Sequence, residues 1–530
     1  MDNNAKKNIA PEKFRFVQQD TKLGDKKFES KPVSYLMDAW RRFCKNKSSI
    51  VGMIIIIILL LFSLVAPFLT NYTVRDLDGH YADVLPKIST NAKGGIWDGT
   101  KKYENGTAVY QRLMAIGVES GRNAVVETYG HYDFVSTSKV NGQDVTTNST
   151  TYSYRKDTYA AVGYVFLDLT KEQYAALQEY QNETGIQVIY PRQKDDLMFS
   201  SVDANYWYKT DKSGIAIAED GSEALTPEAF VNIYRTGSFD DYTSVRLESD
   251  PAYGVTDPDE LAEITDRYSY AKKNQSGYNV RVSYYDYYVY RNGYEPCFIF
   301  GANSKGQDLF VSVASGTRFS LMLAIGIAAV NLILGAVYGA VEGYYGGTTD
   351  LVMERVSDVL SGIPFMVVTV LFQLHLADDV GPVGALIFAF VITGWIGTAS
   401  TVRMQFYRFK NQEYVLAART LGARDRRLIM KHIFPNALGT IITSAALDIP
   451  SVIFSETSLS YLNIISLDDP ASGLTSLGTL LSGGQSEMGA GYFHPILFPA
   501  IVISLLMISF NLFGNGLRDA FNPSLRGSED

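Results

Sequence analysis

Few of the 530 residues have the types and spacing that enzymatic chemistry requires. A metal hydrolase needs clustered ligands such as an HExxH pair. The two cysteines, Cys44 and Cys297, are too far apart to suggest a disulfide framework or a zinc site. No Gly-Lys dipeptide occurs, so the P-loop that cradles nucleotide phosphates is absent. We therefore predict no catalytic residue, metal ligand or cofactor here, because the histidines are scattered as well: His80, His131, His375, His432 and His494.

One short motif suggests nucleotide chemistry. Residues 481–485 read LSGGQ, the signature pentapeptide of ATP-binding-cassette ATPases. Without a P-loop this pentapeptide cannot build a nucleotide site, and it falls between two apolar segments. We interpret it as a coincidence in a turn rich in small residues.

Two carboxylates, Asp448 and Glu456, lie in or near an apolar segment. Eight positions correspond to about two helical turns, so both would share one helical face if the helix continues past Pro450. Carboxylates within a membrane are costly and usually face a bundle interior or water. Two interpretations are open: a role at a transport pathway or subunit interface, or hydrated residues at the end of a helix.

The elements that position these residues are apolar segments of membrane length. Residues 50–69 contain no charge, and twenty residues rising about 1.5 Å each cross about 30 Å of hydrocarbon. The run is too long, and too far from the start of the chain, for a cleavable signal peptide. We predict six spans in all, the other five near residues 319–341, 359–376, 381–402, 436–457 and 495–516.

The distribution of Lys and Arg predicts the orientation of these spans. Residues 1–49 hold 12 basic against 6 acidic residues, and residues 401–435 hold 8 against 2. Short flanks rich in Lys and Arg stay in the cytoplasm. We therefore expect both termini inside the cell, and residues 70–318 and 458–494 outside. The loop 343–358 has no positive bias and is placed inside by the parity of the spans alone.

Glycine and proline mark special places in the spans. Gly335, Gly339 and Gly343 recur every four residues, a spacing that lets another helix backbone approach closely, so we assign them to helix packing. Gly362 and Pro364 interrupt the third predicted span. Such a break suits a wall that lines a pathway.

The basic segment 403–435 contains a second candidate site. Tyr414, Ala417, Ala418 and Leu421 follow the i, i+3, i+4, i+7 spacing of one helical face, and Gly422 is a natural stop. The pattern predicts a short helix whose small residues would let a partner's groove come close. A pair of helices lying at the membrane surface would give a similar pattern.

The same segment resembles a known family. EYVLAARTLGARDRRLIMKHIFPNAL resembles the cytoplasmic EAA loop of binding-protein-dependent ABC importer permeases, in particular the C-type subunit of the dipeptide and oligopeptide group. GANSKGQDLF, GAVYGAVEGYYGG, SETSLSYLNI, SLGTLLSGG and FNLFGNGLRDAFNPSLR are similar to further family segments. Together these cover residues 34–70 and about 297–526. Leu416 stands where the family has its Glu.

The resemblance implies the six-helix type I ABC importer fold and a subunit without catalysis of its own. In it, Ala417, Ala418 and Gly422 take the family's small-residue positions and Pro435 its closing proline, so that Tyr414, Leu421 and these residues would couple to an ATPase. Pro364, Asp448 and Glu456 are candidates for the pathway or an interface. The implied partners are a second, homologous permease in a heterodimer, two ABC ATPases that hold ATP and Mg²⁺, and an extracellular solute-binding lipoprotein.

Residues 71–300 differ from the rest of the chain in composition. They hold 27 of the 35 tyrosines and carry 22 basic against 33 acidic residues, a net of 22 − 33 = −11. TKEQ at 170–173 predicts a capped helix ending near Gly185, and Pro227 and Pro258 predict two further helices. Residues 158–169 and 279–290 read as strands. We therefore expect an extracellular α+β domain, inserted between helices 1 and 2.

The sequence thus predicts a cytoplasmic segment (1–49), a first helix (50–70), the insertion (71–300), a permease core (301–520) and a cytoplasmic tail (521–530). The function expected is that of an oligopeptide importer permease in a bacterial plasma membrane, in contact with lipid and without nucleic acid. Two alternatives stay open. The same permease group also handles nickel, glutathione or oligosaccharides, and the spans could instead anchor an extracellular binding or sensing protein.

Overall fold

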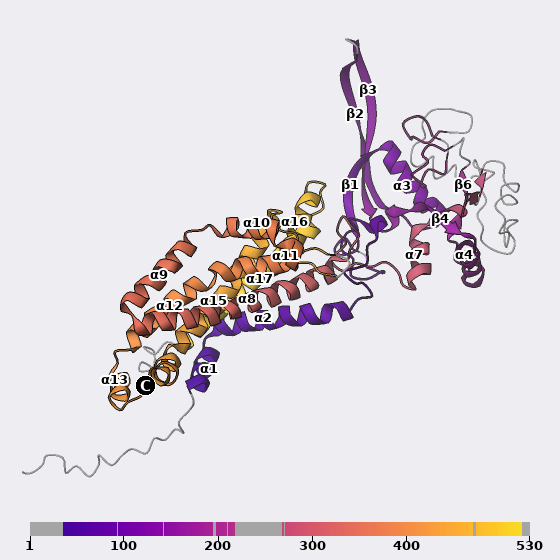
Figure 1. Ribbon diagram of the computed structural model, residues 1–530. Helices are drawn as coiled ribbons and strands as arrows, with labels where there is room; N and C mark the ends of the chain where they lie inside the picture. Colours follow the sequence, from indigo (N-terminus) through magenta and orange to yellow (C-terminus); the bar gives the residue numbers. More distant parts are fainter. Residues whose placement is uncertain are drawn as a thin grey trace, which may run out of the picture.

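The computed structural model describes residues 35–521, apart from 93, 141–142, 194–197, 209, 218–267, 270 and 470–472. The helices predicted after Pro227 and Pro258, residues 1–34 and most of the predicted tail lie outside these described residues. A bundle of long helices and a mixed unit of strands and helices occupy opposite ends of the molecule (Figure 1).

Helices build the bundle. In chain order they are α1 (Tyr35–Lys45), α2 (Lys47–Val65), α8 (Leu309–Tyr345), α9 (Gly347–Ser361), α10 (Phe365–His375), α11 (Ala377–Thr393), α12 (Trp395–Phe409), α15 (Phe434–Tyr461) and α17 (His494–Phe521). Five helical stretches of the described chain are long and apolar enough to cross a membrane, or six if the bent pair α9 and α10 counts as one. The helical membrane-type fold expected from the sequence is confirmed.

The bundle is held by an apolar core and by close helix contacts. Leu59 of α2, Leu321 of α8, Ile453 of α15 and Leu506 of α17 belong to one buried cluster. Gly52 lets α2 approach α17, because a Cβ there would lie 2.7 Å from the backbone oxygen of Ser509. Asn46 precedes α2, and its side chain caps the helix by accepting from Ser48 N.

The third predicted span is broken, as the interruption predicted at Gly362 and Pro364 indicated, although its helical part begins earlier than predicted, at Gly347. α9 and α10 meet at an angle of 72°, with the break between Ser361 and Phe365. Gly362 and Pro364 lie in this break, where the sequence predicted an interruption. Proline has no N–H to continue the hydrogen-bond ladder, which is the physical reason for the sharp turn.

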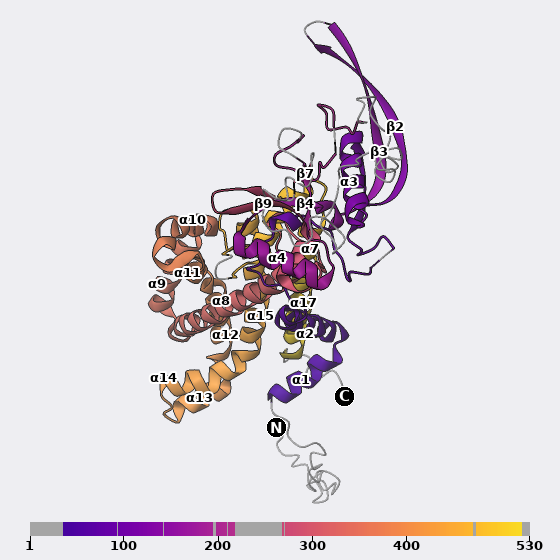
Figure 2. The same ribbon diagram turned by 90° about the vertical axis from the view of Figure 1, so that its right-hand side faces the viewer.

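A three-stranded antiparallel sheet lies in the insertion, in the order β1–β3–β2. Its strands are β1 (Thr100–Gly106), β2 (Val125–Val140) and β3 (Gln143–Asp157), and α3 (Thr107–Ser120) packs on one face. Tyr110 of α3 stacks on Tyr152 and contacts Tyr154 of β3. β2 and β3 extend far beyond α3 as a long hairpin (Figures 1 and 2).

A second sheet joins residues from both halves of the insertion. β4 (Tyr164–Thr170) and β5 (Ile189–Tyr190) both pair with β9 (Gly277–Ser283), which also pairs with β8 (Ala271–Lys273). α4 (Lys171–Thr184) packs here, and its predicted capping box is confirmed: Thr170 and Gln173 each accept from the other's backbone N–H. Outside this sheet, β6 (Arg192–Gln193) pairs with β7 (Tyr268–Ser269).

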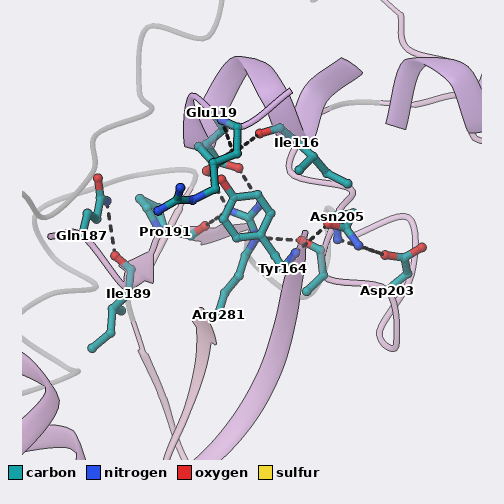
Figure 3. A network of polar contacts seen from close by, with 12 residues as sticks. Ile116, Glu119, Tyr164, Gln187, Ile189, Pro191, Asp203, Asn205 and Arg281 are labelled. Atoms are coloured by element: carbon teal, nitrogen blue, oxygen red, sulfur yellow. Dashed lines mark hydrogen bonds and ion pairs between the residues drawn. The ribbon is translucent and has the colours of Figure 1, made fainter. Parts of the chain in front are cut away.

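A buried ion pair connects α3, which packs on the first sheet, to β9 of the second sheet (Figure 3). Arg281 of β9 donates to both carboxylate oxygens of Glu119 at the end of α3, across 2.7 and 2.6 Å, and both side chains are 1% exposed. The guanidinium also donates to the carbonyls of Ala204 and Pro191 and lies over the Tyr164 ring. A charge can be buried at this depth because each of the three guanidinium nitrogens of Arg281 donates to a partner.

Two strand predictions were wrong in extent. Residues 279–290 continue as β9 only to Ser283, and α7 (Tyr284–Asn292) follows. Tyr284 and Tyr288, one helical turn apart, are both buried, so the helical period prevails over tyrosine's preference for strands. The strand predicted at 158–169 begins at Tyr164, because Ala160–Val162 form a 3₁₀ turn that ends at Gly163 with φ 63°.

The chain enters and leaves the insertion at adjacent points. Tyr72 accepts, through its hydroxyl oxygen, a hydrogen bond from Cys297 N, and Val84 O accepts one from Ala302 N. Gln307 donates to Val74 O across 3.0 Å. The insertion is thus attached where α2 ends and α8 begins.

Candidate coupling site

The short helix predicted in the basic segment is present. α13 (Glu413–Thr420) lies at the end of the bundle opposite the insertion (Figure 1). Gly422 follows it with φ 80°, a backbone conformation that favours glycine. Val415 is the buried residue of α13 and packs in a cluster with Phe406 of α12 and Ala437 of α15. Val415, with half-buried Ala418 packed against the same cluster, therefore anchors the helix.

The predicted stripe of α13 faces largely away from the protein. Tyr414 is 41% exposed and Leu421, just after the helix, is 88% exposed. Ala417 is exposed and Ala418 half-buried. Leu416, at the position of the family's Glu, is 43% exposed. The end of the bundle thus presents an apolar surface made of Tyr414, Leu416, Ala417 and Leu421, which we call the α13 surface.

Hydrogen bonds fix the surroundings of this surface. Asn436 donates to the hydroxyl oxygen of Tyr414 across 3.2 Å, and partial burial raises the pKa of the Tyr414 phenol. Tyr344, in the last turn of α8, donates to Asp425 across 2.5 Å. Arg419 in turn donates to the Tyr344 hydroxyl oxygen at 3.5 Å. The loop that carries α13 is therefore tied to α8 and to α15.

The return to the bundle begins with an irregular helix. After the single turn α14 (Asp425–Arg427), residues 428–433 form a π-helix in which Leu428 and Ile433 are buried. Pro435 follows directly at the start of α15, where it has no N–H to continue the hydrogen-bond ladder from the π-helix. The second amphipathic turn predicted here is therefore irregular in its hydrogen bonding.

Gly335, Gly339 and Gly343 line the side of α8 that meets α12. A Cβ at Gly335 would lie 2.7 Å from Trp395 O, and one at Gly343 would lie 2.8 Å from Arg403 O. At Gly339 a Cβ would overlap the backbone of Ala399. These distances leave no space for a side chain, as tight backbone packing requires.

The two carboxylates of α15 contact different neighbours, although the helix does continue past Pro450. Asp448 accepts from the Thr398 hydroxyl of α12 across 3.2 Å. Glu456 is 1% exposed and accepts from Ser320 of α8 and from Ser460, both at 3.2 Å. Glu456 therefore lies inside the helix packing of this chain. Pro364, the third candidate for the pathway, is exposed at the break before α10.

The segment around LSGGQ was expected to be a turn and is a helix. α16 (Leu477–Met488) lies at the insertion end of the bundle (Figure 1). Ser476 caps it by accepting from Thr479 N, and serine at such a position was the available sequence signal. Ser482 and Gly483 line a polar cavity of about 350 Å³ together with Asn463 and Glu487. The sequence did not predict this cavity.

A cluster of charges around Arg403 was also not predicted. Arg403 of α12 forms ion pairs with Asp350 and Glu354 of α9, at 2.6 and 2.9 Å. Asp350 and Glu354 are four positions apart, which puts them on one helical face. That spacing was the signal available in a loop for which charge counting gave no orientation.

These features together define a class of protein. An apolar helical bundle of membrane length, broken at one span and carrying a short exposed helix at one end, is typical of an integral membrane protein. The family model "Binding-protein-dependent transport system inner membrane component" matches residues 331–527, and the model "N-terminal TM domain of oligopeptide transport permease C" matches residues 34–86. The chain belongs to this family of transport permeases.

Curated relatives agree with the family assignment. The chain is 42% identical over 227 residues to the oligopeptide transport system permease protein OppC of Bacillus subtilis, covering 43% of this chain and 72% of that protein. It is 39% identical to the dipeptide transport system permease protein DppC of the same organism, over 43% of this chain and 69% of that protein. The family consists of ABC importer permeases, which are not enzymes; ATP hydrolysis takes place in partner subunits.

Two solved structures align with part of the chain. An amino acid ABC transporter aligns over 39% of this chain and 93% of its own, with a TM-score of 0.31 and 17% identity. The methionine transporter MetNI in an inward-facing conformation aligns over 40% and 96%, with a TM-score of 0.33 and 15% identity. At these scores neither alignment adds to the assignment.

Proposed function

We propose that the chain forms half of the translocation pathway of an importer for oligopeptides. Membership of the permease family supports the assignment to an ABC importer. The names of the relatives, which are oligopeptide and dipeptide permeases, favour peptides over nickel, glutathione or an oligosaccharide. A second, homologous permease would complete the pathway as a heterodimer, and the type I importer arrangement is part of the proposal.

The α13 surface supports a role in coupling to an ATPase. It is apolar and exposed although it sits on a polar, basic loop, and Val415 anchors it to α12 and α15. A helix held in this way can lay its exposed face in a groove of another protein. In the proposed complex, two ATPase subunits bind ATP and Mg²⁺, and one of them receives α13. The residues assigned to coupling are Tyr414, Ala417, Ala418, Leu421, Gly422 and Pro435.

Substitution of Ala417 tests this role directly. Ala417→Arg places a long charged side chain on the α13 surface and should abolish both ATPase co-purification and uptake. Ala490→Arg is the matched control, since Ala490 is an equally small, exposed residue beyond the far end of α16. Uptake by Ala417→Arg at the wild-type rate would contradict the proposal and would favour an anchored binding or sensing protein instead.

The cargo can be tested on the assembled complex. Peptides of several lengths should stimulate ATP hydrolysis in the presence of the solute-binding lipoprotein, whereas nickel, glutathione and oligosaccharides should not. Stimulation by one of those solutes and not by peptides would replace the proposed cargo while leaving the importer class intact.

The proposed orientation places α13 and both termini in the cytoplasm of a bacterial cell and the insertion outside. Leu421, which follows α13, and Val202, which belongs to the insertion, are both 88% exposed. Figure 1 shows α13 and the insertion at opposite ends of the molecule. In a chain with Cys44 and Cys297 replaced by serine, a membrane-impermeant maleimide should label Val202→Cys on intact cells. Leu421→Cys should react only after the cells are opened, and the reverse pattern would invert the topology.

We further propose that the insertion receives the solute-binding protein, because it lies at the end of the bundle away from α13. Deletion of residues 75–295, with a short linker in their place, should weaken docking of that protein while the helices remain assembled. Unchanged docking and uptake would exclude this role. The domain boundaries expected from the sequence serve as the design for this deletion.

A further inference from the structure

α9 is an unusual element of the bundle, because none of its side chains is buried. Leu351, Val352 and Val359 are 58%, 60% and 71% exposed. Apolar packing within this chain therefore does not determine where α9 lies. Whatever fixes α9 to the rest of the permease must act through a few specific contacts.

Arg403 of α12 provides most of these contacts. Its Nε and Nη2 donate to the two oxygens of Asp350 at 2.6 and 2.9 Å. Its Nη1 and Nη2 donate to the two oxygens of Glu354 at 2.9 and 3.1 Å. A guanidinium that forks onto two carboxylates holds them in a fixed orientation, which a lysine ammonium cannot do.

The next turns of α12 strengthen the same attachment. Tyr407 donates to Asp350 across 2.7 Å, and Lys410 lies over the Tyr407 ring while donating to Gly343 O. Buried Glu342 of α8 lies 3.5 Å from Arg403 Nε. Arg403 thus sits where α8, α9 and α12 meet, and we call Arg403, Asp350 and Glu354 the α9 clamp.

The clamp connects the coupling helix to the broken span. α12 ends at Phe409 and α13 begins at Glu413, with Val415 of α13 packed in the same cluster as Phe406. α12 and α13 should therefore move together. On the other side, α9 is joined to α10 by the 72° bend at Gly362 to Pro364. The α9 clamp is the side-chain connection between α12 and α9 on this route, beside the covalent link of α8 to α9 at Gly346 and the hydrogen bond from Tyr338 of α8 to Met353 O of α9.

We propose that Arg403 is a positioning residue that carries the movement of α13 to α9 and so changes the bend between α9 and α10 during transport. This inference rests on the proposed function, because it requires an ATPase to move α13. It assigns to Arg403 no contact with the cargo. Cutting the clamp should leave ATPase docking intact and separate ATP hydrolysis from uptake.

The test uses the complete transporter with its ATPases and binding protein in lipid vesicles. Arg403→Gln should keep ATPase co-purification and hydrolysis within about twofold, while solute moved per ATP falls about tenfold, within the usual range of coupling between sites. Arg403→Lys should recover part of the coupling, since it keeps the charge and loses the fork. Arg355→Gln is the matched control, because Arg355 is an exposed arginine of α9 paired only locally with Asp358.

A distance measurement separates transmission from a merely structural role. Spin labels at Val359 of α9 and Arg408 of α12, in the chain without native cysteines, should keep the same separation with and without trapped ATP. In Arg403→Gln that separation should become dependent on ATP. The double variant Asp350→Asn with Glu354→Gln should show the same ATP-dependent separation as Arg403→Gln. Adding Arg403→Gln to this double variant should have little further effect.

Two results would overturn the inference. In the first, Arg403→Gln transports with unchanged coupling. In the second, hydrolysis and co-purification are lost together with uptake, which would make Arg403 a support for α13 docking. Failure of the proposed function is distinguishable, since it would appear as normal uptake by Ala417→Arg.

Discussion

The hydroxyl of Tyr344 lies 2.5 Å from Oδ1 of Asp425, which hydrogen-bonds the last turn of α8 to the loop that follows α13. Tyr344→Phe removes this bond and the contact with Arg419 and should cost about 1 kcal/mol of stability, the usual net value of one hydrogen bond. The loop should also open more often. The measurement is the rate of tryptic cleavage after Arg424, Arg426 and Arg427.

The neighbouring tyrosine provides the control for this prediction. Tyr345 is 57% exposed, so Tyr345→Phe removes a hydroxyl from the same turn with little effect on burial. If both variants are cleaved at the same rate, the bond between Tyr344 and Asp425 does not hold the loop.

The contact between α8 and α12 has no room for a methyl group at Gly339. Gly339→Ala would force the new Cβ into the backbone of Ala399 and should destabilise the bundle by about 1–3 kcal/mol, as overpacking does. Gly326→Ala lies on the same helix, where a Cβ meets no atom within 4 Å, and should be neutral or slightly stabilising. Melting temperatures in detergent give the comparison, and equal values would contradict the tight packing.

Arg281 and Glu119 should behave as a coupled pair in the insertion. Arg281→Met leaves a buried carboxylate without its partner and should cost about 3–5 kcal/mol, whereas Arg281→Met with Glu119→Leu should recover much of the loss. Limited proteolysis of the full chain reports the stability of the insertion. Figure 3 shows that residues from separate parts of the insertion, among them Tyr164 and Pro191, surround this pair.

A partly exposed ion pair serves as the reference. Arg112 and Asp203 form a pair at 2.6 Å with side chains 30% and 26% exposed, so Arg112→Met should be much milder than Arg281→Met. Equal losses of stability in Arg112→Met and Arg281→Met would show that burial does not determine the cost of breaking an ion pair.

Asp83 should make the attachment of the insertion dependent on pH. Burial and the nearby Glu487 carboxylate raise the pKa of Asp83 to about 6, from an unfolded value of about 3.9. The folded state therefore favours protonated Asp83. The protonated Asp83 side chain therefore contributes to the stability of the folded state. This contribution is complete below about pH 4 and is lost as the pH rises through about 6.

The melting temperature of the wild type should accordingly fall between pH 5 and pH 7.5 more than that of Asp83→Asn. Asparagine suits the positive φ of 57° at this residue and stays neutral. Glu183→Gln, which neutralises an exposed carboxyl of α4, should leave the pH profile unchanged. A variant Asp83→Asn with the wild-type profile would exclude Asp83 as the cause.

Helices with strong local signals could be predicted from the sequence. The uncharged run at 50–69 corresponds to α2 and the 3₁₀ turn after it, because length and apolarity alone define such a segment. The spacing of Tyr414, Ala417, Ala418 and Leu421 predicted α13, and Thr170 with Gln173 predicted the start of α4. In each case the determining interactions lie within a few residues of one another.

Features that depend on distant residues were not predictable in the same way. In the sequence alone, Arg403 is one of several basic residues in the segment 401–435, and its ion pairs with α9 appear only in the folded chain. Glu119 and Arg281 are 162 positions apart, so nothing local marks them as partners. The helix α7 was missed because its tyrosines favour a strand, and only burial of one side of it decides the competition.

The two points where the chain enters and leaves the insertion are joined by hydrogen bonds, and this has a consequence for how the protein could evolve. Hydrogen bonds from Cys297, Ala302 and Gln307 close the gap between the two crossing points, so the ends of α2 and α8 meet as they would across a short loop. The permease helices need not adjust to the size of the domain inserted between them. Such a junction is a place where an ancestor could acquire, enlarge or shed a whole module in a single genetic event.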